Sequence, residues 1–193
     1  MKKSIVFFYL FFSMLNVIAQ NDSFKKGDNI ISGSIGLFSE NDKDLEIKSN
    51  SISFFTGFGH FIKDNISLGA SLGIISGKEI ESNIVTDDAR VLAFDVFGRY
   101  YLNPKSKILL FGQLDLGCGF ANDNIADIQT RIFNISATPG IDYFITEKIA
   151  LEAGFGTIGY TFLKDNVEGA NGVSRFDLNL NLGKIDFGVI YRF

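Results

Sequence analysis

Residues 66–74, Ile66-Ser67-Leu68-Gly69-Ala70-Ser71-Leu72-Gly73-Ile74, decide the fold because their polarity alternates at every position. Successive side chains of a β-strand point to opposite faces, so a period of two residues predicts a strand with two different faces. Ile, Leu and Ala occupy one face of this strand, whereas Ser and Gly occupy the other. The apolar face carries no charge. The stretch therefore predicts a strand that separates a hydrophobic medium from a polar one.

The same alternation recurs along the chain and predicts about eight strands in all. Clusters of Asn, Asp, Lys, Gly and Ser separate the alternating stretches. In the last strand the apolar parity switches near Gly183, which indicates either a bulge or a short extra hairpin at 182–184. The predicted strands span residues 29–38, 51–62, 66–74, 92–102, 108–116, 133–143, 149–155 and 176–193.

The connections between these strands alternate in length. Short turns on one side and long loops on the other are typical of an outer-membrane barrel whose short turns and termini face the periplasm. We therefore expect an all-β fold, a closed antiparallel up-and-down transmembrane β-barrel of about eight strands. Tight turns are expected at 63–65, 103–107 and 146–148, and longer polar loops at 39–50, 76–89, 121–129 and 163–174.

Residues 1–20 differ from the rest of the chain. Lys2 and Lys3 precede an apolar run from Ile5 to Leu15, and short side chains surround Ala19. This layout is that of a secretory signal peptide, and the run is too short to span a membrane comfortably. An uncleaved N-terminal anchor is the alternative. We expect a signal peptide at 1–20, a barrel domain at 21–193, and a location in the outer membrane of a diderm bacterium.

Alternation alone does not distinguish a membrane barrel from a soluble, lipocalin-like barrel. Here the polar face carries mostly small residues rather than the long Lys and Glu side chains of a water-exposed surface. Small polar residues suit the narrow lumen of an eight-stranded barrel, and the uncharged face suits hydrocarbon. Tyr100, Tyr143 and Tyr191 lie near turn-side strand ends, where an aromatic girdle belongs. Because a strand edge in lipid has no water to bond, the first and last strands must pair.

Four charged residues fall on the polar face of the predicted strands: Asp95, Arg99, Asp115 and Glu152. Removing the partner of a buried charge is strongly destabilising, so we expect these side chains to pair inside the lumen as a structural plug. The alternative is a gated pore of low conductance whose charges rearrange.

The sequence offers little for catalysis. Residues 69–73 match the Gly-x-Ser-x-Gly pattern of serine hydrolases, but the pattern lies inside a strand rather than at a strand-to-helix turn. His60 is the only histidine and precedes the turn at 63–65, on the side opposite the outer leaflet. One cysteine and one histidine leave no zinc-like ligand set. We expect no catalytic residue, no metal and no cofactor.

Charge narrows the expected partners. A formal net charge of −4 argues against nucleic acid. The loops at 40–46 and 79–88 are acidic, which is usual for solvated loops, although divalent cations could bridge them to lipopolysaccharide phosphates. Arg90, Arg131 and Arg175 lie near loop–strand junctions, where they could meet such phosphates directly. We expect outer-membrane lipid and lipopolysaccharide as partners.

The chain ends at 188–193 with Gly-Val-Ile-Tyr-Arg-Phe, so Phe193 is terminal and Tyr191 lies two positions earlier. This ending resembles the assembly signal that the bacterial barrel-insertion machinery reads. Residues 59–69 and 138–144 resemble strand–turn–strand pieces of the small outer-membrane β-barrel family related to OmpX and the OmpA membrane domain. The resemblance implies a membrane barrel assembled through Tyr191 and Phe193. It implies no single function, because that family includes adhesins, envelope-tethering proteins and secretion-associated barrels.

The expected role is therefore that of a non-enzymatic barrel, structural or surface-interacting, with a polar-plugged lumen. Three alternatives stay open: a narrow channel, an accessory barrel of a secretion system, and a lipid-modifying enzyme. The sequence identifies no surface partner.

Overall fold

The computed structural model describes residues 24–42, 46–82, 84–104, 106–125, 128–179 and 185–193. Within these ranges no helix has the length and apolar character needed to cross a membrane. The predicted signal peptide and the parity switch near Gly183 lie outside the described residues, so both stay predictions. The strands are β1 (Asn29–Asp42), β2 (Ile47–Lys63), β3 (Ile66–Glu81), β4 (Ile84–Tyr101), β5 (Ile108–Asp123), β6 (Ile128–Phe144), β7 (Ile149–Phe155), β8 (Thr157–Asp165), β9 (Val173–Asn179) and β10 (Ile185–Arg192).

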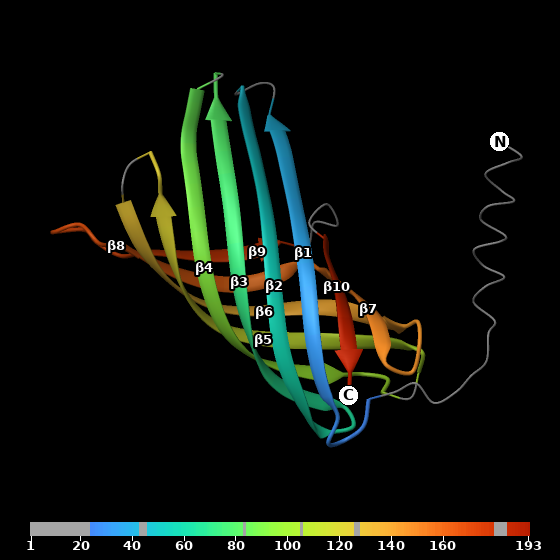
Figure 1. Ribbon diagram of the computed structural model, residues 1–193. Coiled ribbons are helices and arrows are strands. Elements are labelled where there is room, and N and C mark those ends of the chain that lie inside the picture. Colours follow the sequence, from blue (N-terminus) through green and yellow to red (C-terminus); the bar gives the residue numbers. More distant parts are fainter. Residues whose placement is uncertain (1–23, 43–45, 83, 105, 126–127, 180–184) are drawn as a thin grey trace, which may run out of the picture.

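Eight of these strands pair into a ring (Figure 1). Strands β1 to β6 form an antiparallel up-and-down meander in which each strand pairs with the next. Strand β6 then pairs with β7, β7 with β10, and β10 with β1. The first and last strands of the ring therefore meet, as lipid requires of a strand edge. The predicted all-β, antiparallel, up-and-down barrel is confirmed.

The predicted strand at 149–155 matches β7, β8 follows it as a strand that the sequence did not predict, and the predicted strand at 176–193 is divided between β9 and β10. Gly156 separates β7 from β8 and has a φ of 75°, a conformation that favours glycine. Gly140 pairs with Gly154 but Ala137 pairs with Ile158, so the β7–β8 segment carries one extra residue opposite β6. Such a bulge bends a strand. Beyond it β8 pairs with β9, whereas β10 pairs with β7 and β1.

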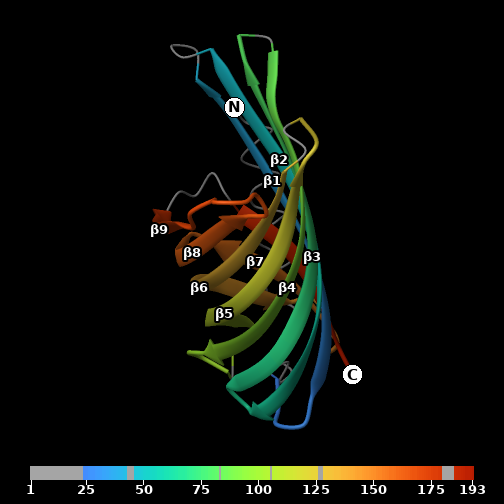
Figure 2. The same ribbon diagram turned by 90° about the vertical axis from the view of Figure 1, so that its left-hand side faces the viewer.

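The loop-side hairpins are longer than the sequence predicted. Strand β1 continues to Asp42 and β2 begins at Ile47, while β3 continues to Glu81 and β4 begins at Ile84. The prediction of long loops at 39–50 and 76–89 was therefore wrong, because most of these residues form paired strands. A hairpin that extends beyond the lipid does not need an apolar face. The alternation of apolar and polar residues therefore ends there, although the hydrogen-bond ladder between the strands continues. Figure 2 shows these ends of β1–β4 running in a different direction from β8 and β9.

The apolar residues of the ring strands point outward. On β3 the exposed fractions of Leu72 and Ile74 are 54% and 59%, whereas Ser67 on the opposite face is 0% exposed. A soluble barrel would bury the apolar face and expose the polar one. The observed arrangement is that of a membrane barrel, whose lipid-facing band is apolar.

We expect Leu72→Arg to lower the free energy of unfolding in lipid vesicles by about 2–4 kcal/mol, because it places a charge near the middle of the apolar face. Ile84→Arg, at the exposed loop-side start of β4, is the matched control and should cost about 0–1 kcal/mol. Urea unfolding in phosphatidylcholine vesicles, followed by tyrosine fluorescence, measures both. Equal losses would contradict the lipid-facing assignment.

Candidate functional site

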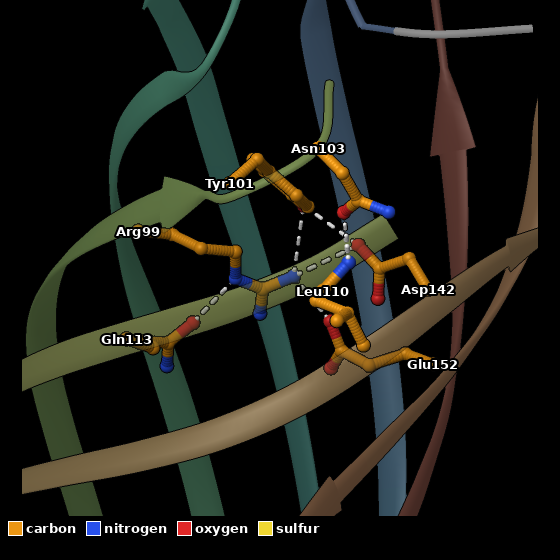
Figure 3. A network of polar contacts seen from close by, with 7 residues as sticks. All are labelled: Arg99, Tyr101, Asn103, Leu110, Gln113, Asp142 and Glu152. Atoms are coloured by element: carbon orange, nitrogen blue, oxygen red, sulfur yellow. Dashed lines mark hydrogen bonds and ion pairs between the residues drawn. The ribbon is translucent and has the colours of Figure 1, made fainter. Parts of the chain in front are cut away.

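The ring encloses a polar network centred on Arg99, which points inward from β4 (Figure 3). Its guanidinium forms ion pairs with Glu152 of β7 and with Asp142 of β6, the second at 3.4 Å between Nη1 and Oδ2. Arg99 Nε donates a hydrogen bond to Oε1 of Gln113 on β5 at 2.8 Å. The Arg99 side chain is 6% exposed, so its charge is compensated inside the lumen. One side chain thereby links β4, β5, β6 and β7.

Tyr101 and Asp115 extend this network. The Tyr101 hydroxyl donates to Asp142 Oδ2 at 2.6 Å and accepts a hydrogen bond from Arg99 Nη1 at 3.3 Å. Gln113 Nε2 donates to Asp115 Oδ1 at 2.7 Å. The Gln113 amide therefore connects Asp115 to Arg99. Hydrogen-bonded charges of this kind are stronger than neutral pairs, and each locks the orientation of the next.

The structure brings the four lumen residues singled out by the sequence together only in part. Arg99 and Glu152 are directly paired, and Asp115 joins them through Gln113. Asp95 is 8% exposed and lies in the same cross-strand row as Asn134, with Gly117 between them. Within the described part of the chain Asp95 forms no ion pair. The network is thus built around one cation and the carboxylates nearest the turn side.

Sequence reasoning missed the two most buried members of the network. Asp142 is 0% exposed and Tyr101 is 1% exposed. Asp142 lies directly opposite Glu152 on the neighbouring strand, and it belongs to the polar face of its own strand. That parity could have identified Asp142. The same parity separates the inward Tyr101, which shares the face of Arg99, from the outward Tyr100 beside it.

On the loop side of Arg99 the lumen contains a cavity of about 270 Å³. Ser and Thr side chains supply much of its polar lining, and Arg99 is the one cation in that lining. The lining is acidic, because four carboxylates face one guanidinium. These carboxylates belong to Asp95, Asp115, Glu152 and Asp186.

An aromatic cluster lies at the turn-side end of the lumen. Phe24, which precedes β1, packs inside the ring with centroid distances of 4.3 Å to Phe61, 4.9 Å to Phe144 and 5.2 Å to Tyr101. Phe111 makes an edge contact with Tyr101 at 5.9 Å. Phe24 is 1% exposed. We call these five residues the aromatic seal.

Backbone hydrogen bonds hold the segment that carries Phe24. The amide of Lys26 donates to Asp64 Oδ1 at 2.8 Å, and the amide of Gly27 donates to the Phe61 carbonyl at 2.8 Å. Gly27 has a φ of 96°, a backbone conformation that favours glycine, in the turn before β1. The chain before β1 is therefore fixed to the β2–β3 turn with Phe24 directed into the barrel.

The structure separates the residues that a hydrolase would need. His60 lies on the outward face of β2, with Nδ1 2.9 Å from Asn29 Oδ1. Ser71 lines the lumen cavity and therefore lies on the inner face of the wall. Among the described residues, no group of three or more His, Cys, Asp or Glu side chains could hold a metal ion.

The C-terminal residue completes the contact between β10 and β1. The Phe193 amide donates to the Asn29 carbonyl at 2.9 Å, and the Asn29 amide donates to the Phe193 carbonyl at 3.1 Å. The rings of Tyr191 and Phe193 stack outside the barrel at 6.2 Å. Their surface is open to a partner, and their role as an assembly signal stays a prediction.

These features define a class: a small antiparallel barrel with an apolar exterior and polar side chains in its lumen. Neither a family model nor a curated protein matches the chain. Among solved structures it is similar to the outer membrane protein OprG from Pseudomonas aeruginosa, with 14% identity and a TM-score of 0.57, over 90% of this chain and 99% of OprG. Neisserial surface protein A has 16% identity and a TM-score of 0.52, over 87% of this chain and 98% of that protein. The chain has the fold of the small outer-membrane β-barrel proteins, in agreement with the predicted resemblance.

Phe24→Ala should lower the free energy of unfolding of the mature chain in vesicles by about 3–5 kcal/mol, because it leaves a cavity among packed rings. Phe176→Ala is the matched control, since Phe176 is 71% exposed on β9. Urea unfolding of both variants measures the difference. A loss no larger than that of the control would contradict the packing of Phe24 inside the barrel.

Arg99→Met should cost about 3–5 kcal/mol of folding free energy, because Asp142 and Glu152 would face each other without a cation. The double variant Arg99→Met/Glu152→Gln should recover part of this loss, since one of the two carboxylates is neutralised. Unfolding in vesicles at neutral pH compares the two. If the double variant is the less stable one, Arg99 does not compensate these carboxylates.

Proposed function

We propose that the protein is an integral outer-membrane barrel with a sealed lumen, and that it acts without catalysis as a structural or surface-interaction component of the cell envelope. Two obstructions of the lumen carry this proposal. The Arg99 network spans the lumen, and the aromatic seal occupies its turn-side end. Export by a signal peptide at 1–20 and assembly through Tyr191 and Phe193 belong to the same proposal. The apolar exterior supports residence in a membrane.

The two closures oppose a permanently open channel. A solute that crossed the barrel would have to displace a guanidinium bonded on three sides and then separate five packed side chains. Breaking a buried ion pair costs about 3–5 kcal/mol, and aromatic side chains bury large apolar areas. These costs favour a closed lumen, and they argue against the narrow-channel alternative.

The loop-side hairpins support a role in surface contact. Strands β1 and β2 remain paired as far as Asp42 and Ile47, and β3 and β4 remain paired as far as Glu81 and Ile84. Paired strands present their side chains in fixed positions, and a preorganised surface loses less entropy when it binds a partner. The cell-surface end of the proposed barrel is thus a stiff platform.

Single-channel recording in planar bilayers tests the sealed lumen, with protein extracted from outer-membrane fractions. The wild-type protein should give no stable conductance, whereas Phe24→Ala/Arg99→Ala should give steps or a leak because both closures are removed. Phe176→Ala should stay silent as a control.

Two results would overturn the proposal. Steady conductance of the wild-type protein would refute the seal. Absence of a folded form, one whose gel mobility changes on heating, from the outer-membrane fraction would refute the location.

A further inference from the structure

An apolar groove lies on the outward face of β4, β5, β6 and β8, and two cations lie on its loop side, next to its lining residues Phe133 and Phe162. Arg131 of β6 and Lys164 of β8 are direct cross-strand partners, and both side chains are exposed. One step toward the turn side on the same face, Phe133 pairs with Phe162. On the other side of Arg131, its cross-strand neighbour on β5 is Phe120. The two cations therefore lie at the loop-side end of the apolar outward face.

The groove has a volume of about 430 Å³. Cys118 lies at its centre, between its cross-strand neighbours Phe94 and Phe133. A small side chain between two large rings leaves a hollow that a hydrocarbon chain can enter. Apolar side chains dominate the lining, among them Phe94, Leu116, Cys118, Phe133, Ile135 and Tyr160.

The cation pair conflicts with the usual arrangement of charges in a sheet. Like charges directly opposite each other on neighbouring strands are destabilising. Arg131 and Lys164 form the one such pair of cations in the registers of the described strands. Neither forms an ion pair with a carboxylate among the described residues, whereas Lys78 lies 3.5 Å from Asp88. Such local conflicts are expected at functional positions.

We propose that this face binds a phosphate-bearing glycolipid of the outer leaflet, of the lipid A class. Its phosphate lies between Arg131 and Lys164, and one of its acyl chains occupies the groove. Guanidinium groups bind phosphate through two parallel hydrogen bonds, and an anion between the two cations removes their repulsion. Cations on the loop side and hydrocarbon on the turn side match the order of headgroup and chain in that leaflet. The proposal rests on the outer-membrane location and gives a residue-level site to the expected lipid partner.

Lipid retention measured by native mass spectrometry tests the site. Mature protein is loaded with bisphosphorylated lipid A or with its dephosphorylated form and then washed with detergent. Wild-type protein should retain the phosphorylated lipid at least about tenfold better, a difference of ~1.4 kcal/mol. Arg131→Ala/Lys164→Ala should abolish this preference. Lys63→Ala/Lys148→Ala removes the same charge on the turn side and should preserve it.

The groove has its own test. Cys118→Phe fills the hollow and leaves both cations in place, so it should reduce retention of phosphorylated lipid A several-fold. Unchanged retention would overturn the placement of the acyl chain. Equal retention of phosphorylated and dephosphorylated lipid by the wild type would overturn the phosphate site. Equal retention of phosphatidylglycerol and lipid A would overturn the choice of a glycolipid.

The stability of the barrel in two kinds of vesicle distinguishes a lipid site from a purely structural role of Lys164. In neutral phosphatidylcholine vesicles, Lys164→Ala should leave the urea midpoint unchanged or raise it, because it removes repulsion. In vesicles that contain lipid A it should lower the midpoint, because it removes a phosphate ligand. A shift of the same sign in both lipids would overturn the proposal. Conductance tests the seal separately, so failure of the lipid site leaves the sealed barrel standing.

Discussion

The requirement that every backbone amide and carbonyl in lipid find a partner governs this structure. It makes β10 pair with β1, so that the wall becomes a ring. Once the ring is closed, alternate side chains of each strand must face either hydrocarbon or a narrow interior. The apolar exterior and the polar interior are two results of this one constraint.

Inside the ring, on the turn side of the cavity of about 270 Å³, the side chains make two kinds of contact. Toward the loop side Arg99 is bonded to Glu152, Asp142 and Gln113 from three other strands. Toward the turn side the rings of the aromatic seal pack against one another, and the Arg99 guanidinium lies 4.0 Å from the centroid of Phe111. Tyr101 belongs to both, because its ring packs in the seal and its hydroxyl bonds to Asp142. The polar and apolar fillings are therefore continuous.

The sequence predicted features that depend on local alternation and missed those that depend on distant partners. The pattern at 66–74 predicted a strand with an apolar outward face, because period two is a property of neighbouring residues. The bulge at Gly156 and the separate strand β8 beyond it depend on pairing with β6 and β9, which no short pattern records. Phe24 precedes the first strand and is buried by residues far along the chain, so nothing nearby marks it. Parity could have found Asp142, because it lies on the polar face of its strand.

The span of the central ion pair has a consequence for the kinetics of assembly. Arg99 and Glu152 are 53 positions apart, and β5 and β6 lie between their strands. Until β7 arrives, the guanidinium lacks Glu152, and burial in hydrocarbon would cost about 2–4 kcal/mol. A growing sheet must therefore keep the concave side of β4 hydrated while three more strands join. We therefore expect water to leave that surface late in assembly.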